Sequence, residues 1–327
     1  MNARTLSRRR LLLGLLAGSG ALAAAAPLPA QETTKILVGF PVGATSDTLT
    51  RLIAEQIGKR LRQTIIVENK AGAGGRLANE AVKAAAPDGA TLLMTPVATM
   101  SIYPHSYAGQ LRYDPFKDFA PVAHLANFQI GLAVGANVPA ATLAEYVAWV
   151  KKDPGKNGFY ASAAAGSIPH FFGVMFARAA GISLTHVPYK VTGPAMQALA
   201  AGEIPAVSTV TADIKPLVAA GKARLLAVGG ERQDPAFPGM PTFRELGFDL
   251  VAQPWYGLFA PAGTPTPVIE KLAEAVAQAM ADPAFHRRLV ELALEPTGYG
   301  PQRLAQIMKA DYERWGPAIR ASGYKPE

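Results

Sequence analysis

Two turns rich in small residues carry the groups of this sequence best suited to bind an anion. Residues 39–47 read Gly-Phe-Pro-Val-Gly-Ala-Thr-Ser-Asp, and residues 162–170 read Ser-Ala-Ala-Ala-Gly-Ser-Ile-Pro-His. Each turn is expected to follow a strand and to open a helix, where the first backbone N–H groups have no carbonyl partner within the helix. Because small side chains leave those groups accessible, the chemistry that this pattern favours is the binding of a carboxylate.

The candidate ligand-binding residues come from these two turns and from the ends of other expected strands. Either turn alone could be an ordinary connection from a strand to a capped helix, and Ser167 is a candidate N-cap. A ligand held between two such turns on different lobes accounts for both of them together. The candidates are Phe40, Pro41, Gly43, Ala44, Thr45, Ser46, Asp47, Thr95, Ser162, Ala165, Gly166, Ser167, His170, Tyr189 and Thr209.

The motifs of catalysis and of metal binding are missing from the sequence. A third small-residue turn, Gly-Ala-Gly-Gly-Arg-Leu at 72–77, lacks the last glycine of a dinucleotide-binding fingerprint. No phosphate-binding loop and no Gly-x-Ser-x-Gly elbow occurs, there is no cysteine, and the five histidines are far apart. Ser167 and His170 are better explained as a cap and a pocket side chain than as a nucleophile and its base. We therefore expect no catalysis, no cofactor and no metal, with an α/β enzyme acting on a small carboxylate as the alternative.

The N-terminus indicates export. The first ten residues hold four arginines and no acid, and an uncharged stretch rich in Leu and Ala follows at 11–26. Ser7–Leu12 resembles the twin-arginine signal, with the ordinary secretory route as the alternative. We expect residues 1–30 to be an export signal, cleavage near Ala30, and a periplasmic location.

The charge of the chain argues against nucleic acid as a partner. The formal net charge is +8, and because the expected signal holds four arginines and no acid, the mature chain carries +4. The remaining charges are interspersed, whereas a nucleic-acid footprint needs Lys and Arg clustered on one element. The mature surface therefore gives only slight help to an anionic ligand.

Strands and helices alternate along the chain, which predicts an α/β fold. Apolar runs are typical of strands that helices cover on both faces, and alternation favours mainly parallel sheets. Two such series predict two lobes: residues 31–126 plus 254–327 form lobe 1, and residues 127–253 form lobe 2. The expected strands are 35–40, 64–68, 91–95, 128–134, 158–162, 184–188, 206–210 and 224–228, and the expected helices are 47–61, 77–86, 143–152, 169–180, 194–201, 214–220, 268–280, 284–294 and 302–322.

Several stretches resemble the Bug family of TctC-like proteins, the periplasmic binding subunits of tripartite tricarboxylate transporters. The similarity runs in one colinear order over essentially all of residues 35–327. It rests on Phe40–Asp47, Val67–Gly75, Ala86–Leu93, Tyr113–Val122, His186–Lys190, Ala219–Val228 and Trp255–Pro265.

The resemblance implies a two-lobed periplasmic-binding-protein fold, type II-like, with the ligand in the cleft between the lobes. It also implies a small organic carboxylate as ligand, a two-subunit membrane permease as partner, and no enzymatic activity. We expect a monomer, and a ligand sensor for a signalling partner stays as an alternative role. Thr209 stands where relatives often place an Asp that meets a ligand ammonium, so an amino-acid ligand is disfavoured. The alanines at 163–165 make the neighbouring wall apolar.

Overall fold

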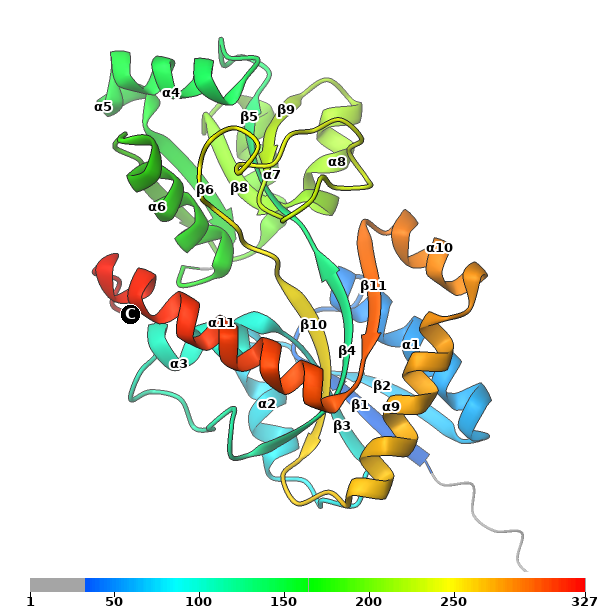
Figure 1. The fold of residues 1–327 in the computed structure, drawn as a ribbon. Helices are drawn as coiled ribbons and strands as arrows, with labels where there is room; N and C mark the ends of the chain where they lie inside the picture. Colours follow the sequence, from blue (N-terminus) through cyan, green and yellow to red (C-terminus); the bar gives the residue numbers. More distant parts are fainter. Residues whose placement is uncertain (1–32, 164, 327) are drawn as a thin grey trace, which may run out of the picture. The chain divides into compact units, whose positions relative to one another are not determined.

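The computed structural model describes residues 33–163 and 165–326, which belong to one compact unit (Figure 1). The export signal predicted for residues 1–30, including its end near Ala30, lies outside the described residues. Within the part of the chain that the structure describes, no helix has the length and apolar character needed to cross a membrane.

The first sheet has six strands in the order β11-β4-β10-β3-β1-β2. β1 is parallel to β2 and β3, whereas β10 is antiparallel to β3 and β4, and β11 is antiparallel to β4. The strands are β1 (Thr33–Val38), β2 (Thr64–Asn69), β3 (Thr91–Pro96), β4 (Phe119–Phe128), β10 (Trp255–Pro261) and β11 (Leu294–Tyr299).

The second sheet has five strands in the order β7-β6-β8-β5-β9. β6 is parallel to β7 and β8, and β5 is antiparallel to β8 and β9. The strands are β5 (Ile130–Gly135), β6 (Phe159–Ala163), β7 (Thr185–Tyr189), β8 (Ala206–Val210) and β9 (Ala223–Val228).

Helices connect the strands in both sheets, and two short turns of other helical types precede α2 and α3. The α-helices are α1 (Thr45–Leu61), α2 (Arg76–Lys83), α3 (Tyr103–Ser106), α4 (Leu143–Lys152), α5 (Pro154–Asn157), α6 (Ile168–Ala180), α7 (Thr192–Ala201), α8 (Thr211–Ala219), α9 (Thr266–Met280), α10 (Pro283–Glu291) and α11 (Pro301–Ala321), and the short turns are η1 (Ala73–Gly75) and η2 (Ala98–Ile102).

The apolar face of α1 fixes this helix against the first sheet. Leu49, Ile53 and Ile57 recur at helical spacing and are at most 1% exposed. They pack in one core with Ile36 and Val38 of β1. Because each such buried side chain stabilises the fold by about 1.5–3 kcal/mol, the start of α1 is held firmly beyond the end of β1.

The predicted α/β fold with two helix-flanked sheets is confirmed, but the strand directions differ from the expected mainly parallel arrangement. Both sheets are mixed, because β4, β5, β10 and β11 run antiparallel to their neighbours. β4, up to its last residue, and β10 lie where no strand was expected, and β11 begins at the expected end of helix 284–294.

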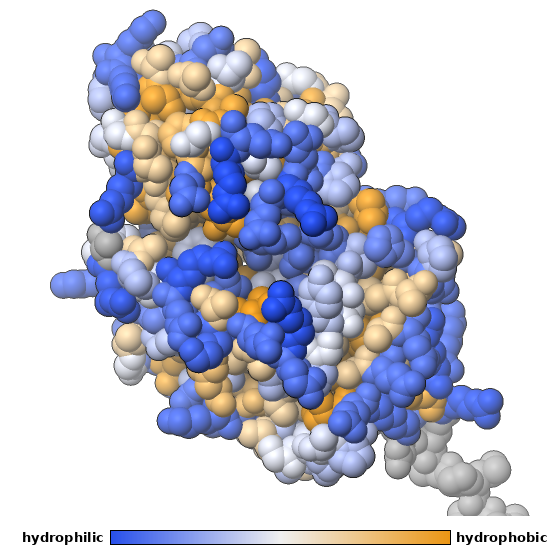
Figure 2. Space-filling model, in the orientation of Figure 1, coloured by the Kyte–Doolittle hydropathy of each residue, from blue (hydrophilic) through white to orange (hydrophobic). Residues whose placement is uncertain are grey.

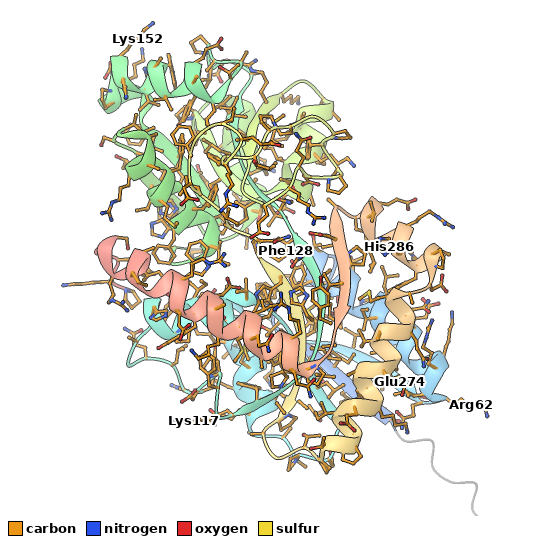
Figure 3. The ribbon with its side chains drawn as sticks, in the orientation of Figure 1. Arg62, Lys117, Phe128, Lys152, Glu274 and His286 are labelled. Carbon is orange, nitrogen blue, oxygen red and sulfur yellow. The ribbon has the colours of Figure 1, made fainter. Side chains whose placement is uncertain are left out.

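One extended segment passes from the first sheet to the second, because only Gln129 separates β4 from β5. Phe128, at the end of β4, is labelled in Figure 3, and its ring stacks on Tyr256 of β10 at a centroid distance of 4.6 Å. The first sheet takes its strands from residues 33–128 and 255–299, and the second from residues 130–228. The predicted lobes, residues 31–126 plus 254–327 and residues 127–253, stay a prediction. The division of the strands between the two sheets supports it.

The exposed face shown in Figure 2 carries hydrophilic residues interspersed with apolar ones. Several ion pairs on the surface join neighbouring turns of one helix, such as Lys59 with Glu55 at 2.6 Å. Pairs of this kind contribute only a few tenths of a kcal/mol. The stability of the fold therefore depends on its buried contacts.

Candidate functional site

Asp47 organises the turn between β1 and α1. Its Oδ2 accepts a hydrogen bond from the Gly43 amide at 2.9 Å, and its Oδ1 accepts one from Asn69 Nδ2 at 2.8 Å. Arg51 Nη2 lies 2.9 Å from Oδ1, and Arg51 Nε donates to Oδ2 at 3.1 Å. With all these partners, the 2% exposed Asp47 serves to position the turn rather than to meet a ligand.

The protonation state of Asp47 follows from the same contacts. Burial alone would raise the pKa of this carboxyl, but hydrogen bonds from Arg51, Gly43 and Asn69, together with the Arg51 charge, lower the pKa below its usual value. The turn is therefore braced by a carboxylate that is ionised at neutral pH. Gly43 has a φ of +84°, a conformation that favours glycine at the tip of the turn.

The first amides of α1 remain available for a ligand. Ala44, the N-cap, offers no side-chain acceptor, and its own amide donates to the Pro41 carbonyl at 3.2 Å. Among the residues that the structure describes, no acceptor is found for the amides of Thr45 and Ser46. Thr45 is partly exposed, whereas Ser46 is only 4% exposed. Since the amide end of a helix favours negative charge, the Thr45 amide is the candidate donor to a carboxylate at this turn.

A cavity of about 250 Å³ lies at the start of α1. Its lining comes from the first turn of α1, the first turn of α8, and the end of α10, so segments attached to both sheets contribute. α8, like α1, has an N-cap without a side-chain hydrogen bond. The lining residues are Gly43, Thr45, Thr48, Ala212, Asp213, Lys215, Glu291, Leu292 and Ala293.

The second predicted turn, between β6 and α6, is bonded internally. The Ser167 hydroxyl donates to the Ala163 carbonyl at 2.8 Å and accepts from the His170 amide at 3.5 Å, which confirms Ser167 as the N-cap of α6. The Gly166 amide donates to His170 Nδ1 at 3.0 Å. Ser162, which is 0% exposed, bonds through its hydroxyl to His186 Nε2 at 2.8 Å. The Ser162 and Ser167 hydroxyls and the Gly166 amide therefore already have partners and are not free to meet a ligand.

Two stacked imidazoles support this second turn. The rings of His170 and His186 lie 3.9 Å apart with an interplanar angle of 19°. Burial lowers the pKa of His170 to about 4, and burial together with the His170 charge lowers the pKa of His186 to about 3. Both rings are therefore neutral at physiological pH and act as packing groups.

The remaining sequence-predicted residues are dispersed around these two turns. The Phe40 carbonyl accepts from Asn69 Nδ2 at 3.0 Å, and Thr95 Oγ1 lies 2.6 Å from Thr99 Oγ1. Tyr189 ends β7, and Thr209 is buried in β8, where it pairs with Gly131. Pro41 and Gly43 are exposed, and Ala165 is partly buried.

The structure brings only Gly43 and Thr45 of the predicted residues to the cavity. Ala212, Asp213 and Lys215, which also line the cavity, were not predicted, because β8 passes directly into α8 without a glycine-containing turn of the kind used as a signal. The available signal was Asp213, an acidic residue that follows the end of β8 within four positions. The described residues contain no group of three or more His, Cys, Asp or Glu side chains that could hold a metal ion.

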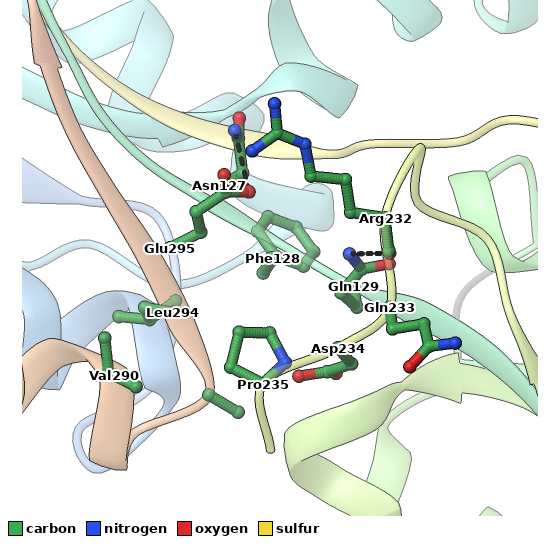
Figure 4. Close-up of a pocket in the computed structure, with 11 residues that line it drawn as sticks. Asn127, Phe128, Gln129, Arg232, Gln233, Asp234, Pro235, Val290, Leu294 and Glu295 are labelled. Carbon is green, nitrogen blue, oxygen red and sulfur yellow. Dashed lines mark hydrogen bonds between the residues drawn. The ribbon is translucent and has the colours of Figure 1, made fainter. Parts of the chain in front are cut away.

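A second cavity, of about 160 Å³, lies where β4 passes into β5 (Figure 4). There Asn127 Nδ2 and Gln253 Nε2 both donate to Glu295 Oε2, at 3.3 and 3.0 Å. Gln129 Oε1 and Asp234 Oδ2 are buried and have no partner among the described residues, which is typical of positions that hold water. None of the predicted ligand-binding residues lines this cavity.

The role of Ser167 can be tested by replacing it with alanine. Because its hydroxyl is committed to the α6 cap, we expect the free energy of unfolding to fall by about 1 kcal/mol while carboxylate affinity stays within twofold. Melting and calorimetric titration of the same sample measure both quantities. A tenfold loss of affinity would show instead that the hydroxyl contacts the ligand.

Comparison with known proteins identifies the family. The family model described as "Tripartite tricarboxylate transporter family receptor" matches residues 49–324. The chain is 35% identical over 302 residues to the UPF0065 protein in the gbd 5′ region of Cupriavidus necator, covering 90% of each chain. It resembles the structure of R. palustris Rpa4515 with adipate at 29% identity and a TM-score of 0.83, covering 90% of this chain and 98% of that one.

A further solved structure points the same way. MatC from Rhodopseudomonas palustris with bound malate is 33% identical, with a TM-score of 0.77, and the match covers 89% of this chain and 100% of that one. The sequence resemblance, the family match and the shared two-sheet fold agree over nearly the whole chain. The chain therefore belongs to the receptor family of the tripartite tricarboxylate transporters, and the receptors of this family are solute-binding proteins and not enzymes.

Proposed function

We propose that this protein captures a small organic carboxylate outside the cytoplasm and delivers it to a two-subunit membrane permease. The observation that carries the proposal is the start of α1, where the uncapped Thr45 amide borders a cavity that segments of both sheets enclose. Two related structures contain the carboxylates adipate and malate. A binding role for the same class of ligand follows from the same fold and from amide donors suited to an anion.

The two predicted turns have different roles in this proposal. The β1–α1 turn supplies the Thr45 amide to the carboxylate, and Asp47 holds that turn in shape. A hydrogen bond to a charged ligand is worth about 1.5–3 kcal/mol, and the positive end of the helix adds to it. The β6–α6 turn is not assigned a hydrogen bond to the ligand, because the Ser162 and Ser167 hydroxyls and the Gly166 amide are already bonded.

A thermal-shift screen of the mature protein tests the proposal. Mono-, di- and tricarboxylates are each added in large excess, and at least one should raise Tm, since a ligand at 100 times its Kd adds about 2.7 kcal/mol of stability. The absence of any shift across the panel would contradict the proposal. Recovery of the bound acid unchanged, checked by mass spectrometry, separates a receptor from an enzyme acting on a carboxylate.

The proposal includes a periplasmic location, a monomeric state and cleavage near Ala30. The family supports the location and the permease partner. A permease as partner, rather than a signalling protein, is tested by whether deletion of the genes for a two-subunit permease of this transporter family abolishes uptake of the bound acid. Size-exclusion chromatography of the mature chain tests the monomeric state.

The export route yields a prediction on the first ten residues. If Arg8 and Arg9 form a twin-arginine pair, changing both to lysine should leave most of the precursor in the cytoplasm. Cell fractionation with an antibody against the mature protein measures the distribution. The conservative exchange keeps the positive charge, so normal maturation of the double variant would assign the chain to the ordinary secretory route.

A further inference from the structure

Helix α11 is fixed to the first sheet by buried hydrogen bonds. Asp311 Oδ2 accepts one from Trp255 Nε1 of β10 at 2.7 Å, and the Met308 carbonyl accepts one from the Ser101 hydroxyl of η2 at 2.9 Å. Trp255 is 1% exposed and Ser101 is 0% exposed. Because a buried polar group that loses its partner is costly, these contacts hold α11 firmly in place.

The chain turns sharply beyond the end of α11. Gly323 has a φ of +68°, a conformation that favours glycine after a helix, and its amide donates to the Arg320 carbonyl at 3.3 Å. The Ser322 hydroxyl accepts a hydrogen bond from the Tyr324 amide at 3.2 Å. These contacts fix the direction in which Tyr324 leaves the helix.

The ring of Tyr324 lies on the β6–α6 turn of the second sheet. It meets the rings of His170 and Phe171 edge to face, at centroid distances of 5.5 Å and interplanar angles of 70° and 88°. A Cβ added to Gly166 would lie 2.8 Å from the Tyr324 hydroxyl oxygen and 2.9 Å from Cζ, closer than real Cβ atoms approach. A residue anchored through α11 to the first sheet therefore packs closely on a turn of the second.

This contact bears on the ligand cavity, because segments attached to both sheets line that cavity. Thr45 of α1 lies on one side of it and Ala212 of α8 on the other. A change in the spacing between the sheets therefore changes the cavity. Tyr324 packs against a hydrophobic core to which both Tyr103 of α3 and Phe171 of α6 belong, so its ring is placed to control that spacing.

We propose that Tyr324 is a positioning residue, whose ring sets the spacing between the two sheets and thereby the affinity of the cavity for its acid. The effect on affinity rests on the proposed function, whereas the effect on spacing requires no ligand. Without the two edge-to-face contacts, a smaller fraction of the protein holds the arrangement that binds. The apparent affinity falls in proportion to that fraction.

Pulsed electron paramagnetic resonance measures the spacing directly, because the sequence has no cysteine and two can be introduced for spin labels. Lys117→Cys labels the segment just before β4 of the first sheet, and Lys152→Cys labels the end of α4, which follows β5 of the second. Both lysines are exposed (Figure 3). Without ligand, Tyr324→Ala should broaden the distance distribution, whereas Tyr324→Phe keeps the ring and should retain the narrow distribution of the wild type.

Calorimetric titration of the same variants uses the acid of the thermal-shift panel that most raises Tm. Tyr324→Ala should bind it about three- to tenfold more weakly, the factor that aromatic pairs of this kind are worth, and Tyr324→Phe should stay within about twofold of the wild type. Tyr324→Leu provides a second variant if alanine prevents folding, and it should also bind more weakly.

Tyr312→Ala is the matched control on the same helix. Tyr312 is also half-buried, but its ring stacks on His105 of α3 at 4.1 Å, so it stays on the side of the first sheet. Its loss should lower Tm without changing the distance distribution or the affinity. A general loosening of α11 would instead affect both variants alike.

The outcomes separate this inference from the proposed function. If no acid of the panel binds the wild type, the proposed function is wrong, and the distance measurement still decides the role of Tyr324 in spacing. If Tyr324→Ala keeps the wild-type distribution, or if Tyr312→Ala broadens it equally, the inference is wrong and the proposed function stands. A broadened distribution with unchanged affinity, or a phenylalanine variant that behaves like alanine, would equally overturn the inference.

Discussion

Replacing Asp47 with alanine is expected to lower the free energy of unfolding by about 2–3 kcal/mol and to weaken carboxylate binding by at least tenfold. The substitution leaves the Gly43 amide, Asn69 and Arg51 without their shared acceptor. Removing one partner from these part-buried hydrogen bonds costs about 1–3 kcal/mol, and the half-exposed Arg51 adds little because water can solvate it. Chemical denaturation and calorimetric titration measure the two effects.

A matched control lies on the same helix. Glu55 is an exposed acid that pairs with Lys59 one turn later, so Glu55→Ala should change stability by no more than about 0.5 kcal/mol and leave binding intact. Equal effects of the two substitutions would contradict the positioning role of Asp47. Asp47→Asn keeps one acceptor oxygen and should fall between the wild type and alanine.

The pH dependence of the Asp47 contribution has a defined sign. Its pKa is lowered in the folded protein, so the ionised form stabilises the fold at pH values above the unfolded pKa of about 4. That contribution is lost as the pH falls through the folded pKa. The stability gap between the wild type and Asp47→Ala should therefore be largest near pH 7 and shrink below pH 4, and a gap that widens in acid would contradict this account.

Thr45→Pro is expected to weaken carboxylate binding by at least tenfold while the fold stays intact. Proline removes the amide hydrogen at the first position of α1, where the helix itself does not use it and where proline is favoured. Ala44 already has φ −63° and ψ 154°, a conformation that a following proline requires. One hydrogen bond to a charged ligand is worth about 1.5–3 kcal/mol, and titration calorimetry measures its loss.

Thr45→Ala is the control for the side chain. It removes the same hydroxyl but keeps the amide, so its affinity should stay close to that of the wild type. The circular dichroism and Tm of both variants should match those of the wild type within a few degrees. If alanine weakens binding as much as proline does, the hydroxyl rather than the amide contacts the ligand.

Local patterns were sufficient to predict most elements of the fold. The helix predicted at 143–152 is α4 with the same bounds, because Thr142 and Glu145 form a capping box at its start. No strand was predicted at β11, since a proline such as Pro296 usually interrupts a strand. The first sheet places β11 at its edge, where a proline without an N–H is tolerated.

The candidate site was predictable only in part, because its groups meet through tertiary structure. The turn around Gly43 was evident from its small residues and from the helix that follows. The internal use of Asp47 depends on Asn69, which lies 22 residues later and reaches it through the pairing of β1 with β2. The contribution of Asp213 depends on how α8 and α1 approach one cavity, which no local pattern specifies.

A crystal structure of the mature protein with its tightest-binding carboxylate shows whether the Thr45 amide binds the ligand. We expect a carboxylate oxygen about 2.7–3.2 Å from the Thr45 amide nitrogen, within the cavity that α1, α8 and the end of α10 line. A carboxylate bound elsewhere, with the Thr45 amide contacting only water, would contradict it.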